Sequence, residues 1–397
     1  MWWALPTRLR LSGVPIEEIT TLTSLLILPW ILKAFWAPLV DSVQGRGWTL
    51  REWIISMQLV MGATLLPLAF LDFAEYFWFI RASLLAHAVA ASLQDAAIDS
   101  YAISTVKPSE RGSLNGWMQT GYLTGRALFG GTILIVSGYL AGSKSVLLLC
   151  GALWLIAVIT AAFIRPVRQD PDEPGDKNIR ATFRTYRRHL LSAAGSKKVW
   201  LGLLFAAVAG AAFEGVGAVG GPFLVERGLS GEEVGWFFSL PAVGGMILGS
   251  IAGGISADKM GTARTVRWAT GGIAALTVLI AGMESAGGAV SNRWMVAAFF
   301  SLYLGIGIFT ATTYAMFMNL TDPRLGATQF SAYMGATNGC EAWAGFLTGR
   351  ISGAWGFPGA FMVMAVVSTV SMILISPLHR PGPAEGDPNN PAEEFAR

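Results

Sequence analysis

Seven charged side chains stand inside long apolar stretches of this 397-residue chain: Lys33, Arg81, Asp95, Asp99, Arg126, Glu214 and Glu341. A charge in the hydrocarbon layer of a membrane costs roughly 2.5 kcal/mol or more, so each needs a partner or a function. Four carboxylates face three cations, which leaves one carboxylate in excess. A carboxyl group that can be protonated is what coupling to a proton gradient requires.

Asp95 and Asp99 are four residues apart and therefore share one face of a helix. Two carboxylates on one face repel each other unless a proton or a cation lies between them. We favour Asp95 as a proton or substrate-amine site. For Asp99 we favour an ion-pair network with Lys33 or Arg111 that holds a gate. Lys33 is expected to form such a gate salt bridge or to extend toward the membrane surface.

Glu214 lies in a run of five glycines and a proline between residues 210 and 222. This composition predicts a helix that breaks and frees backbone groups to meet a ligand. The alternative is that the glycines only allow close helix packing. Packing alone does not explain a glutamate at this position, so Glu214 is a candidate substrate or proton site.

Arg126 and Glu341 are 215 positions apart. The guanidinium of Arg126 suits an anionic substrate group such as a carboxylate. Alternatively, Arg126 is permanently paired with Asp95 or another carboxylate. Glu341 and its neighbour Asn338 are expected to face the interior and to contact the substrate.

Aromatic residues divide between the candidate site and the membrane surfaces. Tyr303 lies too deep in its apolar stretch for an interfacial belt, and with Tyr314 it predicts an aromatic lining. Arg81 is expected to anchor one interface. Tryptophans near the ends of apolar stretches are expected at the interfaces as well: Trp2, Trp3, Trp48, Trp53 and Trp78.

No enzyme signature accompanies these residues. The two cysteines, Cys150 and Cys340, lie in apolar runs, and the three histidines have no metal-ligand spacing. We find no Walker loop, dinucleotide fingerprint, zinc-protease motif or nucleophile elbow. We therefore expect no cofactor, no metal and no nucleic-acid partner.

The amino-acid composition indicates which type of secondary structure positions these residues. The chain is 53% hydrophobic and only 13% charged, and its apolar residues come in blocks of about twenty, the length that crosses a bilayer. Since irregular backbone cannot face lipid, each block predicts a helix. We predict an all-α polytopic membrane protein with eleven spans, at 19–40, 53–71, 77–103, 113–139, 146–164, 199–223, 234–256, 267–283, 294–318, 326–349 and 357–376.

The spans divide into two groups. We predict an N-terminal bundle at 1–164 with five spans, a linker loop at 165–198, a C-terminal bundle at 199–376 with six spans, and a disordered tail at 377–397. Counting Lys and Arg in the loops places the linker and the C-terminus on the cytosolic side. Residues before Thr20 are expected to be the outer end of a further helix that the sequence lacks.

Two sequence motifs each occur twice in the chain, with nearly the same spacing between the two copies. The turn with Asp41 and Arg46 matches the turn with Asp258, Lys259 and Arg264, and the two aspartates are 217 positions apart. Gly112, after Arg111, matches Gly326 at 214 positions. We expect the halves to be structural duplicates in parallel topology.

These turns resemble the signature of the major facilitator superfamily, whose C-half copy is well preserved at Gly254, Asp258, Lys259 and Gly261. Residues 28–41, LPWILKAFWAPLVD, together with Gln94-Asp95, Asp99 and residues 110–112, look like the branch of AmpG-type muropeptide permeases, RhtX/FptX-type siderophore permeases and acetyl-CoA transporters. The resemblance implies two helical bundles around a central cavity. It also implies that cytosolic turn charges latch the halves: Asp41, Arg46, Asp258, Lys259 and Arg264.

We therefore expect a monomeric secondary transporter of the bacterial inner membrane that works by alternating access. The expected activity is proton-coupled import of a bulky polar solute, muropeptide-like or siderophore-like. The alternatives are an exporter of drugs or other small molecules, an incomplete fragment that does not transport, and a membrane-embedded enzyme.

Overall fold

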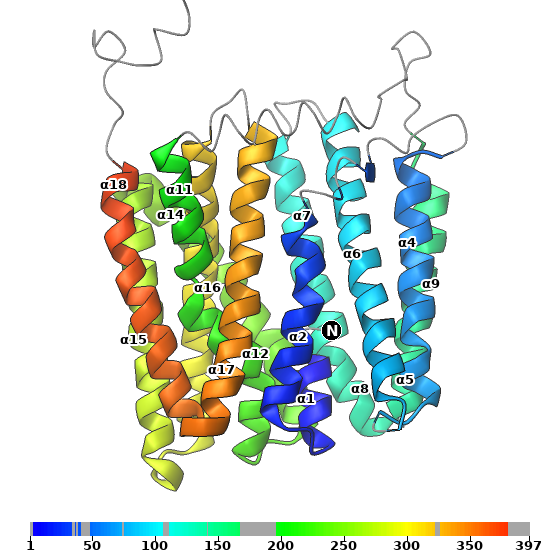
Figure 1. Ribbon diagram of the computed structural model, residues 1–397, viewed down its shortest axis with the longest axis horizontal. Helices are drawn as coiled ribbons and strands as arrows, with labels where there is room; N and C mark the ends of the chain where they lie inside the picture. Colours follow the sequence, from blue (N-terminus) through cyan, green and yellow to red (C-terminus); the bar gives the residue numbers. More distant parts are fainter. Residues whose placement is uncertain are drawn as a thin grey trace, which may run out of the picture.

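The computed structural model describes residues 3–33, 36, 39–40, 48–73, 75–105, 111–140, 142–166, 196–321 and 326–379. The described part is a bundle of roughly parallel helices (Figure 1). The first half contains α1 (Ala4–Leu11), α2 (Ile16–Ile31), α4 (Leu50–Leu65), α5 (Pro67–Phe70), α6 (Phe77–Thr105), α7 (Arg111–Arg126), a π-helical segment η2 (Ala127–Thr132), α8 (Ile133–Tyr139) and α9 (Gly142–Phe163).

The second half has the same character. It contains α11 (Lys197–Val208), α12 (Ala211–Glu226), α13 (Gly231–Phe237), a second π-helical segment η3 (Phe238–Ala242), α14 (Val243–Met260), α15 (Thr262–Ser285), η4 (Gly287–Ala289), α16 (Asn292–Leu320), α17 (Gly326–Ser371), η5 (Met372–Leu374) and α18 (Ile375–His379).

Seven described helical segments are long and apolar enough to cross a membrane: Leu50–Phe70, Gly142–Phe163, Lys197–Glu226, Gly231–Met260, Thr262–Ser285, Asn292–Leu320 and Gln329–Leu378. The last holds two of the predicted spans, because α17 bends at Gly356, where φ is +72°. Glycine tolerates this left-handed backbone and Pro358 follows it, so the chain turns there. We call residues 326–355 the first arm of α17 and residues 357–371 its second arm.

The remaining predicted spans, at 19–40, 77–103 and 113–139, fall on α2, α6 and α7–α8. These segments are not among the seven. The described α2 is only 16 residues long, and α6 and α7 carry Asp95, Asp99 and Arg126. The prediction of an all-α polytopic membrane protein is confirmed.

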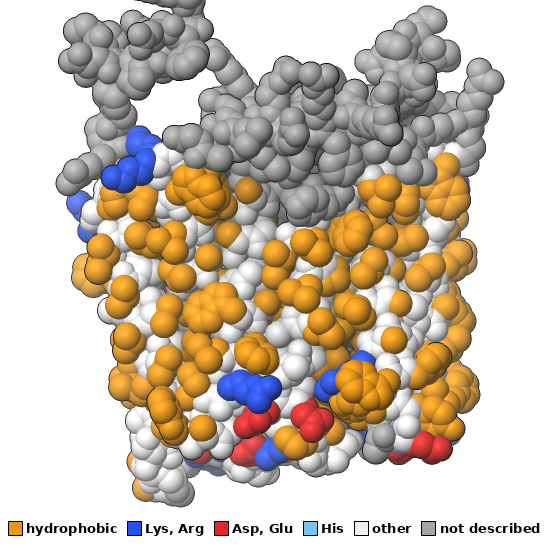
Figure 2. All heavy atoms as spheres, in the orientation of Figure 1, with side chains coloured by type: hydrophobic (Ala, Val, Ile, Leu, Met, Phe, Trp, Pro, Cys, Tyr) orange, Lys and Arg blue, Asp and Glu red, His pale blue; other side chains and the backbone are white. Residues whose placement is uncertain are grey.

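The outer surface matches this assignment. Figure 2 shows an apolar belt over the middle of the bundle, with charged side chains toward its rims. Several tryptophans of the described surface are widely exposed, among them Trp200, Trp268, Trp294 and Trp355. Such residues are favourable against lipid, where apolar surface needs no burial inside the protein.

The two halves meet along two helices that run side by side, α2 and α17 (Figure 1). Further contacts join α1 to α12 and α8 to α13. We call the end of the bundle that borders the 165–198 segment the linker end. The opposite end, with the turn at Ser12–Pro15, is the far end.

Small residues let the helices of the second half approach closely. A Cβ on Gly249 would lie 2.0 Å from the Leu304 carbonyl oxygen, and one on Gly307 would lie 2.2 Å from the Met246 carbonyl oxygen. These contacts join α14 to α16 backbone to backbone, as small residues do in membrane helices. The packing alternative concerns the glycines of residues 210–222, and two of them do make close contacts: a Cβ on Gly215 would lie 2.5 Å from the Thr348 hydroxyl oxygen, and one on Gly221 would lie 2.0 Å from that of Thr7.

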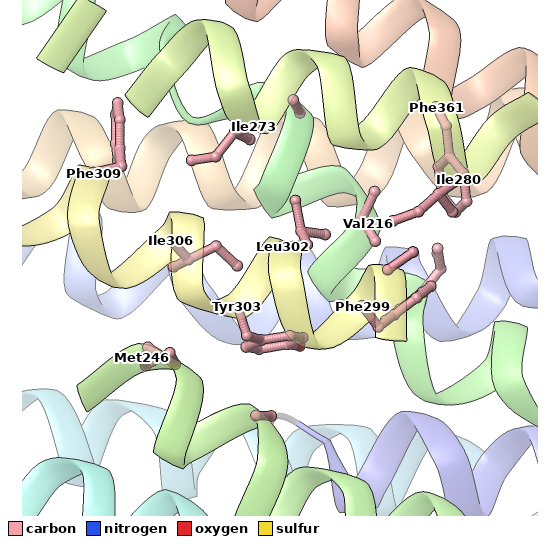
Figure 3. Packing of buried hydrophobic residues seen from close by; sticks show 14 of the residues in the cluster. Val216, Met246, Ile273, Ile280, Phe299, Leu302, Tyr303, Ile306, Phe309 and Phe361 are labelled. Atoms are coloured by element: carbon pink, nitrogen blue, oxygen red, sulfur yellow. The ribbon is translucent and has the colours of Figure 1, made fainter. Parts of the chain in front are cut away.

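An aromatic core fills the second half. Phe223 stacks on Phe299 with ring centroids 5.6 Å apart, and it contacts Phe357 and Phe361 edge-on. Figure 3 shows Tyr303 on α16 pointing toward α14, on the other side of the helix from Ile273. This packing fixes α16 and α12, which carry candidate site residues.

Candidate functional site

Three charged residues from both halves come together in the bundle. Arg126 is the last residue of α7, Glu214 lies in the first turn of α12, and Glu341 lies in the first arm of α17. The charges of both glutamates interact with the Arg126 guanidinium, and the charge of Glu341 acts on Glu214. The sequence predicted each of the three separately, and the fold places them in one cluster.

None of the three is neutralised by a close partner. Within the described residues, Arg126, Glu214 and Glu341 form no ion pair of 4.0 Å or less, and the Arg126 Nε atom is buried without a hydrogen-bond acceptor. All three side chains are only partly buried. The alternative of a permanent pair between Arg126 and Asp95 is not seen. The cluster is therefore accessible and available to a ligand.

The backbone after Arg126 is unusual. The helix continues from Arg126 into the π-helical segment η2, in which one residue more than usual fits into a turn. Such segments are rare and often lie at functional sites. Here η2 packs against η3 of the other half, where the Thr132 and Ser239 hydroxyl oxygens are 3.2 Å apart.

Tyrosines surround the charged cluster. Tyr122, one helical turn before Arg126, is 51% exposed, and the Arg126 guanidinium lies 4.7 Å from its ring centre. Tyr314 is half-buried and interacts with the same charges. Tyr122 was not singled out from the sequence. Its spacing of four residues from Arg126 is the signal that could have identified it.

Tyr303 and Asn338 lie beside the cluster in different ways. Tyr303 is only 4% exposed and packs edge-on against Trp3, Phe237 and Phe238. It therefore forms part of the packed wall and offers little surface to a ligand. Asn338 is half-buried, one turn before Glu341 on α17.

The expectation that Trp3 lies at a membrane interface is wrong. Trp3 is 5% exposed, stacks on Phe238 with centroids 4.7 Å apart, and lies 5.6 Å from the Arg126 guanidinium. The cause is that α1 packs against α12 of the other half, where Gly221 leaves room for Thr7. Sequence position near an apolar end could not reveal this contact.

The predicted break in the helix that carries Glu214 is limited to two residues, Ala209 and Gly210, which keep right-handed helical dihedral angles, and α12 continues unbroken through Pro222. The helical hydrogen-bonding pattern ends at Val208 and resumes at Ala211, leaving Ala209 and Gly210 between α11 and α12. The Glu214 N–H donates to the Gly210 carbonyl oxygen at 2.9 Å. The break thus sets the first turn of α12 and, with it, the place of Glu214.

A second charged cluster joins α2 to α6. The Lys33 ammonium lies 2.7 Å from Asp95 Oδ2 and 2.6 Å from Asp99 Oδ2. The predicted ion pair between Lys33 and Asp99 is therefore present, and Asp95 shares the same cation. Like the first cluster, this one contains two carboxylates and one cation.

The motif at residues 28–36 explains how Lys33 reaches its partners. α2 ends at Ile31, so the Pro29 carbonyl lies in the last turn, where carbonyls need outside donors. The Ser92 hydroxyl donates to it at 2.8 Å and the Trp36 indole at 2.9 Å. Ser92 precedes Asp95 and Asp99 on one face of α6, so the same face holds the end of α2 and the Lys33 ammonium.

A separate cavity of about 440 Å³ lies inside the first half, between α1, α2, α4, α6 and α9. Its lining is mostly leucine and other apolar side chains, with His87 and Arg8 among them. The charged clusters described above do not border it. This cavity is therefore not the candidate site. Within the described residues, no group of three or more His, Cys, Asp or Glu is placed to hold a metal ion.

The sequence as a whole decides the family. The pattern that defines the Major Facilitator Superfamily matches residues 4–349, which is most of the chain. The chain belongs to the major facilitator superfamily. It has the fold of a transporter and is not an enzyme.

Solved structures agree with this family at the level of the fold. A bacterial homologue of the human lysosomal transporter Spinster, in an inward-facing and occupied conformation, aligns with a TM-score of 0.73 at 13% identity, over 96% of this chain and 93% of that one. A mutant of the nucleoside transporter NupG gives 0.71 at 11% identity, over 95% and 94%. A D-xylose-proton symporter gives 0.70 at 10% identity, over 92% and 89%.

One relative aligns by sequence along most of its length. It is an uncharacterized protein of Haemophilus influenzae, 23% identical over 401 aligned positions, which cover 94% of this chain and 90% of that protein.

The superfamily's turn residues are placed only in part. Asp258 and Lys259 end α14 and Arg264 begins α15, and all three side chains are exposed. Gly261 between them has φ +84°, a conformation that glycine adopts readily. Asp41 and Arg46 lie outside the described residues, and the side chain of Arg111 is not described. The latch that these residues were predicted to form stays a prediction.

The far end of this facilitator carries polar ties between its halves that the sequence did not suggest. Arg10 Nη2 lies 2.7 Å from Glu226 Oε1, Arg350 Nη1 lies 3.6 Å from Glu17 Oε2, and the Tyr139 hydroxyl donates to Glu232 at 2.7 Å. Each contact joins one half to the other. The close approach of Gly131 to Ser239 is a further contact between the halves.

Proposed function

We propose that this protein is a proton-coupled secondary transporter that imports a bulky polar solute, muropeptide-like or siderophore-like, by alternating access. The observation that carries the proposal is the cluster of Arg126, Glu214 and Glu341. It unites helices of both halves and lacks close ion pairs among the described residues. A rocking motion of the halves would make and break such a cluster, which is what alternating access needs.

The cluster offers two kinds of binding. The Arg126 guanidinium presents a planar fork of donors that suits a carboxylate or another oxyanion of the substrate. Glu214 and Glu341 repel each other when both are charged, so one of them is the acceptor of the coupled proton. Tyr122, Tyr314 and Asn338 would contact rings and hydroxyl groups of the same molecule.

The second cluster supplies a further proton site. Two carboxylates share the Lys33 ammonium, so one negative charge stays uncompensated there as well. We assign Asp95 a proton-binding role and Asp99 and Lys33 a gating role. Lys33 ties α2 to α6 through both carboxylates, so its pair with Asp99 would hold α2 in place when Asp95 carries the proton.

The substrate class follows from resemblance and chemistry together. Residues 28–41 resemble those of AmpG-type muropeptide permeases and RhtX/FptX-type siderophore permeases. A cluster with one cation, two carboxylates and several tyrosines suits a ligand that carries anionic groups, donor groups and rings. We further infer a monomer in the bacterial inner membrane with the linker end in the cytosol, where turn charges latch the halves when the far end opens.

Uptake into sealed, right-side-out membrane vesicles under an imposed inward proton gradient tests this function. The panel contains an anhydromuropeptide, a ferric siderophore and a cationic dye. We expect gradient-dependent accumulation of the first or the second. Accumulation of the dye in inverted vesicles alone would identify an exporter. No transport of any compound by inserted, folded protein would contradict the proposal.

A further inference from the structure

The gap between α11 and α12 is held by side chains from elsewhere in the chain. Gly210, the residue before the first turn of α12, has no side chain that could cap the helix. Instead, the Ser368 hydroxyl accepts a hydrogen bond from the Ala212 N–H at 2.8 Å. A serine at the capping position would bond this second N–H of the helix in the same way. Ser368 therefore supplies the cap from another helix.

The same hydroxyl closes the other side of the gap. Ser368 Oγ donates to the Ala209 carbonyl oxygen at 2.8 Å, and the Ser368 side chain is fully buried. The Ser368 hydroxyl oxygen thus bonds both a carbonyl group in the gap, that of Ala209, and an N–H group in the first turn of α12, that of Ala212. Backbone groups at helix ends need such partners where water is absent.

One further side chain holds the gap, and it lies two residues after Glu341. The Trp343 indole N–H donates to the Ala207 carbonyl oxygen at 2.7 Å. Because Glu341 and Trp343 both belong to the first arm of α17, the gap is tied to the segment that carries the second glutamate of the cluster.

We propose that Ser368 is a positioning residue that, with Trp343, holds the gap between α11 and α12 and thereby fixes Glu214 opposite Glu341. Glu214 lies one turn beyond the gap, and its N–H bonds to Gly210. A change at the gap therefore moves the Glu214 carboxyl group directly. This inference rests on the proposed function only in that Glu214 is a group that takes up a proton.

The charged and titratable groups that face Glu214 come from several helices. Glu341 and Arg126 act on its charge, and it acts in turn on the side chains of Tyr303, Tyr314, Tyr122 and Cys340. The strength of these electrostatic interactions depends on the position of the Glu214 carboxyl group. The pH at which Glu214 takes up its proton is therefore a readout of positioning, and overall stability is not.

The experiment is an infrared pH titration of the protonated carboxyl band in purified, lipid-reconstituted protein, which requires no substrate. The band lost in Glu214→Gln identifies Glu214. We expect Ser368→Ala to move its midpoint by at least half a pH unit, because the first turn of α12 loses its cap and the Glu214 carboxyl group shifts relative to Glu341 and Arg126. Ser368→Thr, which keeps the hydroxyl, should restore the wild-type midpoint.

Ser371→Ala is the matched control. Ser371 is also buried, but its hydroxyl donates at 2.6 Å to the Ser368 carbonyl oxygen within the same helix. Its removal should leave the Glu214 midpoint in place. Trp343→Phe keeps an aromatic ring and loses the bond to Ala207, so it should move the midpoint in the same direction as Ser368→Ala. This second variant decides the matter if Ser368→Ala does not fold.

An unmoved midpoint in folded Ser368→Ala, or in Trp343→Phe, overturns the inference. So does the absence of any carboxyl band that Glu214→Gln removes. Failure of the proposed function is distinct, because it shows as a lack of uptake by the wild-type protein. A midpoint that follows the Ser368 variants in a protein without uptake would support the positioning role alone.

Discussion

Arg10 and Glu226 form an ion pair that joins the two halves of the chain, with side-chain atoms 2.7 Å apart. Arg10 lies in the last turn of α1, and Glu226 ends α12 at the far end. The two residues are 216 positions apart, close to the spacing of 214 and 217 positions at which the turn motifs repeat. Arg126 and Glu341, which lie deeper in the bundle, are 215 positions apart, so both combinations of opposite charge have the spacing of the sequence repeat.

The far-end ties should resist opening. Glu226→Gln removes the charge that Arg10 binds and keeps the size of the side chain. An ion pair of this partial exposure contributes about 0.2–1 kcal/mol, so we expect roughly a 1.5- to 5-fold faster reaction of a thiol placed at the far end. Thr7→Cys provides that thiol between α1 and α12, in a background without Cys150 and Cys340. The measurement is the rate of labelling by a membrane-impermeant reagent.

Glu284→Gln is the matched control for this experiment. Glu284 binds Arg227, but both residues belong to the second half. Its loss should leave the labelling rate unchanged. Equal acceleration by both variants would mean that the ties between the halves do not hold the far end.

The contact between the two π-helical segments should tolerate no added atom. A Cβ on Gly131 would lie 2.4 Å from the Ser239 backbone nitrogen of the other half, whereas nothing lies within 4 Å of a Cβ on Gly138. We expect Gly131→Ala to destabilise the protein by about 1–3 kcal/mol, because the backbone on the other side must move. Gly138→Ala should be neutral or slightly stabilising, since alanine favours helix. Thermal unfolding in detergent compares the two.

Removing the cation of the second cluster alone should be worse than removing it together with one of the two carboxylates. Lys33→Met leaves Asp95 and Asp99 side by side without a counter-charge. We expect a loss of roughly 1–3 kcal/mol, less than for a fully buried pair because these side chains are partly exposed. The double variant Lys33→Met, Asp99→Asn should regain most of the loss. Protein yield and thermal unfolding report the effect, and a double variant as unstable as the single one would contradict it.

Binding of the transported solute should depend on the shape of the cation at position 126 as well as on its charge. Lysine keeps the charge but loses the planar fork. Charged hydrogen bonds of this kind contribute about 1.5–3 kcal/mol, so Arg126→Lys should raise the KM for the transported solute by roughly 10- to 150-fold. Arg81→Lys is the control, because the Arg81 guanidinium stacks on Phe77 within its own helix, 3.7 Å from the ring centre. Equal effects of the two variants would argue against substrate binding at Arg126.

Part of this architecture could be predicted from the sequence, and the reasons are local. Helical spans follow from apolar length, and the short gap before Glu214 includes Gly210, the first glycine of the run, whereas Pro222 does not interrupt α12. The pairing of Lys33 with Asp99 follows from the cost of isolated charges in lipid. The choice of Arg126, Glu214 and Glu341 as site residues follows from the same cost, since a charge this deep needs a partner or a ligand.

The contacts that could not be predicted join residues far apart in the chain. Ser368 and Ala209 are 159 positions apart, and a serine in an apolar helix looks like any other that bonds its own backbone. Trp3 looks like an interfacial tryptophan until α1 is placed against α12 and η3. The far-end tie of Arg10 to Glu226 required the three-dimensional arrangement of both halves.

The central claim is that Glu214 couples proton movement to transport of the solute. The most direct test compares Glu214→Gln with the wild type in two assays of the same reconstituted protein. Uptake driven by a proton gradient should fall at least tenfold in Glu214→Gln. Exchange of labelled for unlabelled solute at equal concentration needs no net proton movement, so its rate should stay within about twofold of the wild-type rate. Such a difference is small, because a tenfold change in rate corresponds to about 1.4 kcal/mol. Gradient-driven uptake by Glu214→Gln at the wild-type rate would contradict the account.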